Sequence, residues 1–234
     1  MSREDWFEWN GVRSTVYGIY VDTQPPVTMP VERVTRITVP GRPGTLTKKE
    51  GEDVYDDLVL SVLCVMKDGT RLAEIMKWLK GSGRVTFANR PGGYYNARVS
   101  NQIPFDKVMR GRDNRTFTIV FRCGPFWNAS GEEDEVLTAP GSVMNEGSVY
   151  SEPVITVKGT GDCTLLVGST VVELTGLTGS ITIDSALQEA YDGLEDMNGR
   201  MSGDFPKLSP GLNGISWEGG GITEVRIRKN TRYL

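Results

Sequence analysis

The stretch 181–215 constrains the fold most, because it predicts a strand, an exposed loop, a rigid corner and a second strand in succession. Ile181 and Ile183 alternate with a threonine, which is the period of a half-buried strand. The range 184–210 is polar and rich in turn residues over most of its length, which predicts a long exposed loop. Large apolar residues and prolines close that loop at a corner: Phe205, Pro206, Leu208 and Pro210. Asn213-Gly214 then predicts a tight turn before a new strand.

The rest of the chain also favours strands over helices. Its 28 Gly and 12 Pro are spread along the sequence, a distribution typical of short strands and turns. Apolar residues gather in segments of strand length, and they predict strands at 16–21, 31–39, 58–66, 116–122, 154–157, 164–167 and 223–228. The segment 58–66 is apolar on both faces, which is typical of a central strand. The range 68–81 carries apolar residues at helical spacing. The predicted fold class is therefore mainly β: all-β with one short helix.

Turn signals predict how these strands are joined. Three aromatic residues precede Asn10-Gly11, which predicts a hairpin at the N-terminus. Charged residues at 48–57 predict a loop. Gly159 with Gly161, and the glycines at 219–221, predict hairpin turns, because no helix follows them to form a phosphate site.

Charge predicts two domains. Residues 1–130 carry 19 Lys and Arg against 14 Asp and Glu, a net charge of +5, whereas residues 131–234 carry 7 against 16, a net charge of −9; the two sum to the −4 of the chain. The acidic range 131–138 separates them. We therefore expect an N-terminal domain at 1–130, an acidic linker at 131–138 and a C-terminal domain at 139–234, each facing different neighbours.

The sequence argues against catalysis. It contains no histidine, which removes the commonest general base and metal ligand. Asp192, Glu195 and Asp196 could bind calcium, but they lack the EF-hand order, so a solvated loop is the preferred interpretation. We expect no enzymatic activity, no cofactor and no metal site. We also expect no signal peptide, no membrane helix, and three reduced cysteines at 64, 123 and 163, because none forms a C-x-x-C pair.

A basic segment is the main candidate surface. Residues 84–122 contain eight Lys and Arg and two acids, a net charge of +6. Contact with an acidic protein partner is the preferred interpretation, a solvated face remains open, and specific nucleic-acid binding is disfavoured because the whole chain is acidic. Aromatics near the N-terminus could contribute as well. The candidate ring or partner interface consists of Trp6, Phe7, Arg98, Phe105, Lys107, Arg110 and Arg112.

Several short motifs occur in a characteristic order along the chain. They are W-N-G before a Y-G-I-Y-V strand, P-G-R-P-G-T-L at 40–46, F-x-C-x-P-F-W at 121–127, N-E-G with S-E-P at 145–153, I-D-S at 183–185 and G-x-F-P-x-L-x-P-G-x-N at 203–213. Each is weak alone, but together they cover nearly the whole chain. In this order and spacing, the sequence resembles the distal tail (Dit) protein family of long-tailed, siphovirus-type bacteriophages.

The resemblance implies a structural role and a particular architecture. It implies an N-terminal split-barrel-like β domain with one helix, closing as a homohexamer into a ring, and a C-terminal galectin-like β-sandwich. The ring would join the tail tube protein to the baseplate hub or tail-associated protein at the tail tip of the virion, with a receptor-binding protein nearby and assembly in the host cytoplasm. The alternative is a carbohydrate-binding, lectin-like module for attachment to the host surface.

Overall fold

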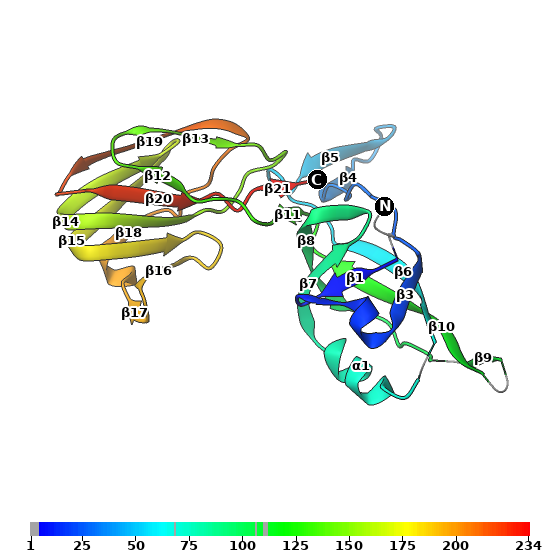
Figure 1. Cartoon of the computed structure of the whole chain (residues 1–234). Coiled ribbons are helices and arrows are strands. Elements are labelled where there is room, and N and C mark those ends of the chain that lie inside the picture. Colours follow the sequence, from blue (N-terminus) through cyan, green and yellow to red (C-terminus); the bar gives the residue numbers. More distant parts are fainter. Residues whose placement is uncertain (1–4, 68, 106, 110–111) are drawn as a thin grey trace. The chain divides into compact units, whose positions relative to one another are not determined.

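The structure, a computed structural model, describes residues 5–67, 69–105, 107–109 and 112–234, and only the backbone at 107–109 and 112–113. The described chain is mainly β with one α-helix, which confirms the predicted fold class. It divides into two compact units, Met1–Trp127 together with Leu234, and Asn128–Tyr233. Each unit encloses a hydrophobic core of its own (Figure 1).

The N-terminal unit is built on a curled antiparallel sheet in the order β2-β1-β7-β8-β10-β6-β3, with β9 beside β10. Its strands are β1 (Phe7–Trp9), β2 (Val12–Arg13), β3 (Ile19–Thr23), β6 (Leu58–Met66), β7 (Ser82–Phe87), β8 (Arg90–Val99), β9 (Lys107–Met109) and β10 (Arg112–Cys123). A short 3-10 helix, η1 (Ser14–Tyr17), takes the place of the first half of the strand predicted at 16–21. At the boundary between the units, β11 (Trp127–Ala129) pairs with β21 (Arg232–Tyr233).

The predicted N-terminal hairpin is confirmed, and its turn is fixed to two other elements. Asn10 and Gly11 adopt left-handed φ values of 51° and 78° between β1 and β2. The Asn10 side-chain oxygen accepts the backbone N–H of Arg84, at 2.9 Å, on β7. The indoles of Trp9 and Trp78 each donate to the backbone carbonyl of the other, at 3.0 and 3.1 Å. These bonds attach the hairpin to the end of the helix.

Strands β6 and β10 supply nine of the nineteen buried residues of the described N-terminal core. Alternate residues of both strands are buried, and their register places Phe117 opposite Cys64. The strand predicted at 58–66 is central, because it lies between β10 and β3. Its central position is therefore confirmed, although the outer face is partly exposed: Val59 has 59% of its surface in solvent.

The helix is confirmed, but it is shorter than the predicted one, which starts at 68–70 and ends before Gly81. Helix α1 spans Leu72–Trp78, and Ile75 and Leu79 enter the core. Met76, which the pattern placed on the same apolar face, is 55% exposed. Successive helical residues are about 100° apart, so Met76 points away when Ile75 points inward.

A second, smaller sheet stands apart from the main one in the N-terminal unit. It consists of β4 (Val34–Thr38) and β5 (Thr45–Lys49), paired only with each other. The strand predicted at 31–39 is therefore shorter, and the first residues of the loop predicted at 48–57 belong to β5. Gly41 and Gly44, both with φ of 79°, form the turn that reverses the chain.

The C-terminal unit is organised by two long strands, β14 (Val154–Val167) and β15 (Thr170–Asp184). The first half of β14 pairs with β20 (Glu224–Arg228), and its second half pairs with β19 (Gly211–Gly219). The sheet therefore bends over itself and forms two layers around the core. The remaining elements are β12 (Glu135–Leu137), β13 (Gly141–Asn145), β16 (Glu189–Asp192), β17 (Glu195–Asp196), η2 (Asn198–Arg200) and β18 (Met201–Gly203).

Three sequence predictions are corrected in this unit. Gly159 and Gly161 lie inside β14 rather than in a turn, and they join the strands predicted at 154–157 and 164–167 into one. The loop predicted at 184–210 contains β16, β17, η2 and β18. Part of the expected linker forms β12, because its alternating residues pair with β20.

Candidate assembly surfaces

The structure separates the three predicted interface aromatics. Phe7 is completely buried and stacks on Trp78 with ring centroids 5.6 Å apart, so its contacts lie within the core. Phe105 is half-buried and meets Phe117 edge to face, with centroids 4.7 Å apart. Trp6 is also half-buried, and the Arg13 guanidinium lies 4.3 Å from its ring centre. Trp6 and Phe105 thus retain surface that a partner could contact.

Of the four predicted basic residues, Arg98 is the one whose side chain lies in the described part of the structure. Arg98 is exposed on β8. Lys107 lies on β9 and Arg112 begins β10, but their side chains are outside the described part of the structure. Arg110 lies outside the described residues altogether. Contact of the basic segment 84–122 with an acidic partner therefore stays a prediction.

The outer surface of the main N-terminal sheet carries three arginines and a tyrosine that we call the basic face: Arg84, Arg98, Arg122 and Tyr94. Arg98 and Arg122 lie directly opposite each other on β8 and β10, and both are exposed. Arg84 lies over the ring of Tyr94, with its guanidinium carbon 4.4 Å from the ring centre. Among described residues, no carboxylate pairs with any of these three arginines. Like charges directly opposite on adjacent strands are destabilising, so the basic face is electrostatically unsatisfied.

Sequence reasoning missed three members of the basic face: Arg84, Tyr94 and Arg122. The net charge over 84–122 pointed to the right segment, but it could not distinguish residues of the main sheet from residues of the connection between β8 and β10. The usable signal was strand parity: Arg122 lies one position from the buried residues Phe121 and Cys123, so it must point outward.

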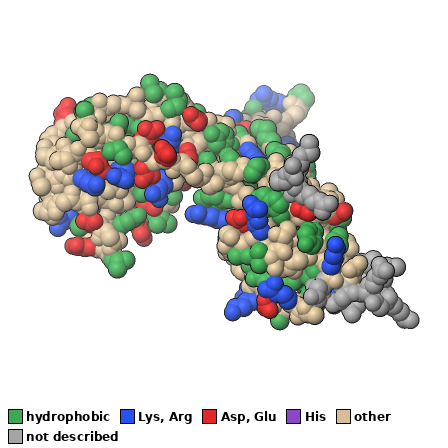
Figure 2. Space-filling model, viewed as in Figure 1, with side chains coloured by type: hydrophobic (Ala, Val, Ile, Leu, Met, Phe, Trp, Pro, Cys, Tyr) green, Lys and Arg blue, Asp and Glu red, His purple; other side chains and the backbone are tan. Residues whose placement is uncertain are grey.

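The β4–β5 ribbon is a second exposed surface. Every residue of β5 is exposed, and Ile37 and Leu46 form a cross-strand pair with 45% and 40% of their surface in solvent. Figure 2 shows basic and hydrophobic side chains at the position that the ribbon occupies in Figure 1. Arg36, Arg42 and Lys48 have no acidic partner among the described residues. A two-stranded ribbon is marginally stable alone in water, so this one is expected to need a partner.

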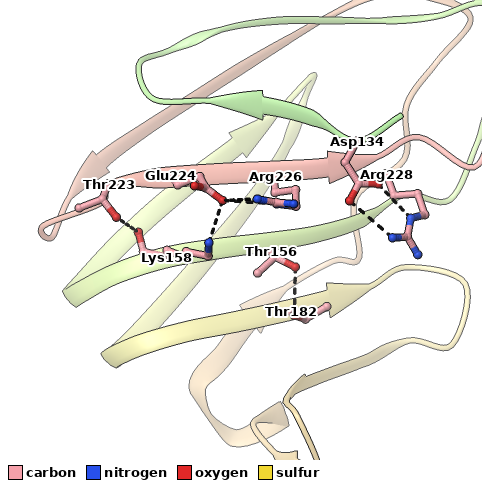
Figure 3. A network of polar contacts seen from close by, with 8 residues as sticks. All are labelled: Asp134, Thr156, Lys158, Thr182, Thr223, Glu224, Arg226 and Arg228. Carbon is pink, nitrogen blue, oxygen red and sulfur yellow. Dashed lines mark hydrogen bonds and ion pairs between the residues drawn. The ribbon is translucent and has the colours of Figure 1, made fainter. Parts of the chain in front are cut away.

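One face of the C-terminal unit, by contrast, is internally paired. Figure 3 shows polar contacts between side chains of β20, β14 and β15, together with Asp134, which lies just before β12. Glu224 accepts from Lys158 at 3.0 Å and from Arg226 at 3.2 Å, while Arg228 contacts Asp134 at 3.0 Å. The hydrogen bond from Lys158, then that from Arg226, lowers the pKa of the Glu224 carboxyl. Figure 2 shows acidic and basic side chains interspersed on this face, as expected for a solvated surface.

The same unit also presents an unpaired acidic protrusion, which we call the acidic hairpin (residues 189–196, β16 and β17). Its turn places Leu194 in solvent with 107% relative exposure. The same hairpin carries four carboxylates: Glu189, Asp192, Glu195 and Asp196. Asp192 accepts from Ser180 and Asp196 accepts from the backbone of Asn198, but no described Lys or Arg forms an ion pair with any of the four.

The described residues contain no group of three or more His, Cys, Asp or Glu side chains that could hold a metal ion. Likewise, none of the described helices is long and apolar enough to cross a membrane. All three cysteines are free and buried, as predicted. Burial raises the pKa of Cys64 to about 12, and burial, then the nearby Asp57 carboxylate, raises that of Cys123 to about 12.

These pKa shifts predict slow thiol chemistry and alkaline sensitivity. At pH 8 a thiol of pKa about 12 is ionised in about one molecule in 10,000, so native Cys64 and Cys123 should react far more slowly than unfolded thiols. Titration after unfolding without reductant should count three thiols, and a count of one would contradict the assignment.

The two buried thiols also predict a loss of stability at alkaline pH. Their folded pKa exceeds the ordinary value of 9.0, so above pH 9 the unfolded chain releases these protons more readily than the folded chain does. Their contribution to the free energy of unfolding is therefore complete below pH 9 and is lost as the pH rises towards 12.

Comparison with known proteins gives a match in structure but none in sequence. No family model and no curated protein matches the chain. The crystal structure of the SPP1 Dit (gp 19.1) protein, described as a paradigm of hub adsorption apparatus in phages that infect Gram-positive bacteria, matches with a TM-score of 0.72 at 17% identity. The match covers 98% of this chain and 99% of that chain, so it includes both units. The resemblance found in the sequence is thus confirmed at the level of the fold: this chain has the fold of the SPP1 Dit protein.

Proposed function

We propose that this chain is a structural protein of a bacteriophage tail tip, and that six copies close into a ring joining the tail tube to the baseplate hub. The observation that carries the proposal is the similarity to the SPP1 Dit protein over nearly the full length of both chains. The partners follow from that role: other copies of this chain, the tube protein, the hub or tail-associated protein and a receptor-binding protein. The location is the virion, after assembly in the host cytoplasm.

The β4–β5 ribbon supports self-assembly on physical grounds. Its exposed Ile37–Leu46 pair and its unpaired cations are suited to a neighbouring protein surface. A contact made between different patches on successive copies either closes into a ring or extends into a fibre. A ribbon that reaches the next copy would provide such a contact.

The ring itself is tested on assembled particles and in concentrated solution. Averaged images of intact tails should show this chain with sixfold symmetry, and a closed ring in solution should have a mass of about 155 kDa, six times 25.8 kDa. Single copies or threefold symmetry in the particle would contradict the proposal.

The ribbon's part in the ring is tested by substitution. Ile37→Thr with Leu46→Thr should abolish ring formation and leave the thermal unfolding of the monomer nearly unchanged, because both side chains are already exposed and threonine keeps the strand preference without adding like charges. Met144→Thr is the matched control, since Met144 has 46% exposure but lies in the other unit. Unchanged assembly of the ribbon variant would remove the ribbon from the contact.

A further inference from the structure

We infer that the basic face of one copy binds the acidic hairpin of a second copy. This contact rests on the proposed self-assembly and deepens it, because it assigns a specific pair of surfaces to the association. It uses the outer sheet surface around Arg98 and Arg122 and the hairpin around Leu194. The β4–β5 ribbon takes no part in it.

Charge complementarity is the first argument. Arg98 and Arg122 hold two positive charges opposite each other with no described counter-ion, at a distance of about 5 Å between Cβ atoms. The acidic hairpin concentrates four carboxylates without a described cation. The opposing net charges of the two parts of the sequence, +5 and −9, favour contact between unlike parts of different copies. Placing carboxylates between the two arginines would convert a repulsive pair into bridged ion pairs.

Shape and apolar surface are the second argument. Val59 lies opposite Arg122 on the neighbouring strand and is 59% exposed, so the basic face has an apolar border. Leu194 stands at the tip of a tight turn, where Gly193 adopts a φ of 61°. A fully exposed leucine on an acidic hairpin matches an exposed valine beside arginines. The ring of Tyr94 holds the Arg84 guanidinium in place, which reduces the side-chain entropy lost on binding.

The test uses charge reversal and complementation in the full-length protein. Arg98→Glu with Arg122→Glu forms the face variant, and Asp192→Lys with Glu195→Lys forms the hairpin variant. At low ionic strength, each variant alone should self-associate about tenfold or more weakly than the unmodified chain, as measured by sedimentation velocity. An equimolar mixture of the two variants should recover association, because each supplies the reversed partner of the other.

Two control variants match the changes in net charge at distant exposed sites. Lys77→Glu with Lys80→Glu changes the charge as the face variant does, and Glu133→Lys with Glu146→Lys changes it as the hairpin variant does. Both controls should associate like the unmodified chain. A further check introduces Leu194→Cys in one chain and Val59→Cys in another. A mixture of the two should form a disulfide-linked dimer, and the three native thiols should not interfere because they are buried.

Several outcomes would overturn the inference. A chain that stays monomeric at millimolar concentration in low salt has no such contact. Variants that self-associate normally, or a mixture that recovers nothing, also exclude it. If the face variant self-associates normally but fails to enter particles, the basic face binds a different acidic protein. The sixfold symmetry of the particle is measured separately, so the ring and this contact can fail independently.

Discussion

Replacing Phe121 by alanine is expected to lower the free energy of unfolding of the N-terminal unit by about 3–5 kcal/mol. Phe121 is completely buried on β10. Its ring lies among those of Phe7, Trp9 and Phe87, with centroid distances of 5.6, 5.4 and 5.9 Å. Truncation leaves a cavity between strands and hairpin that the paired backbone cannot collapse to fill, so both transfer and cavity costs apply.

The loss should be confined to one unit, because each has its own core. Hydrogen exchange followed by mass spectrometry can measure the protection of the two units separately. Val120→Ala is the matched control: Val120 is the preceding residue of the same strand, half-buried on the outer face, and its truncation should cost well under half as much. Equal losses for the two variants, or equal losses in the two units, would contradict this account of the core.

Features that depend on local alternation were predictable from the sequence. The strand at 58–66 and the shared inward face of Phe117 and Phe121 follow from period-two burial, which needs no knowledge of the partner strand. The N-terminal hairpin was predictable for the same reason, because Asn10-Gly11 has the backbone preferences that its turn requires. What periodicity could not provide was the environment of the outer face, where Val59 is exposed despite being apolar.

Glycine and asparagine were harder to interpret, because the same residues mark bends, corners and turns. Gly159 looks like a turn residue but lies in the middle of a long strand. Asn213 looks like the start of a turn, yet it is buried in β19 opposite Val143. Its side-chain oxygen accepts the backbone N–H of Ser209 at 2.9 Å, and its amide donates to the Ser209 carbonyl at 2.8 Å. Asn213 thus closes the preceding corner, which only the tertiary structure reveals.

The motifs that carry the resemblance form hydrogen bonds that hold the fold together. They therefore indicated the fold and not a binding surface. Asn145, from N-E-G, is buried and donates to the carbonyls of Val149 and Leu208. The backbones of Ser151 and Leu208, from two different motifs, exchange hydrogen bonds at 2.9 and 3.0 Å. Ser185, from I-D-S, donates its backbone N–H to Pro153. Motifs distant in sequence therefore meet in the C-terminal unit.

The candidate surfaces could be predicted only as a net charge. The opposition of Arg98 and Arg122 depends on the register between β8 and β10. The sequences of these two strands do not indicate that register. The acidic hairpin was taken for part of an unstructured loop, because Gly193 and its polar neighbours suit a loop equally well. Pairing with β15 makes it a protrusion with a defined tip.

Introducing a single methyl group at Gly159 is expected to cost the C-terminal unit about 3 kcal/mol of unfolding free energy. A Cβ at this position would lie 2.6 Å from the Gly221 carbonyl oxygen and 2.8 Å from Ile222 Cα. Both are backbone atoms, so no side-chain rotation relieves the overlap. The backbone cannot simply withdraw, since the neighbouring residues of β14 hold the same segment through bonds of 2.7 Å from Gly221 and 2.9 Å from Thr223.

Gly214→Ala provides the control that separates this steric effect from a general effect of alanine in a strand. Gly214 also lies in a β-strand of the C-terminal unit, and its added Cβ would meet no atom within 4 Å. Alanine lowers the entropy of the unfolded chain at both positions, so Gly214→Ala should be neutral or slightly stabilising, whereas Gly159→Ala should lower the midpoint of denaturant unfolding strongly. Similar midpoints for the two variants would show that β14 does not make the close approach to 221–222 on which the bend of the sheet depends.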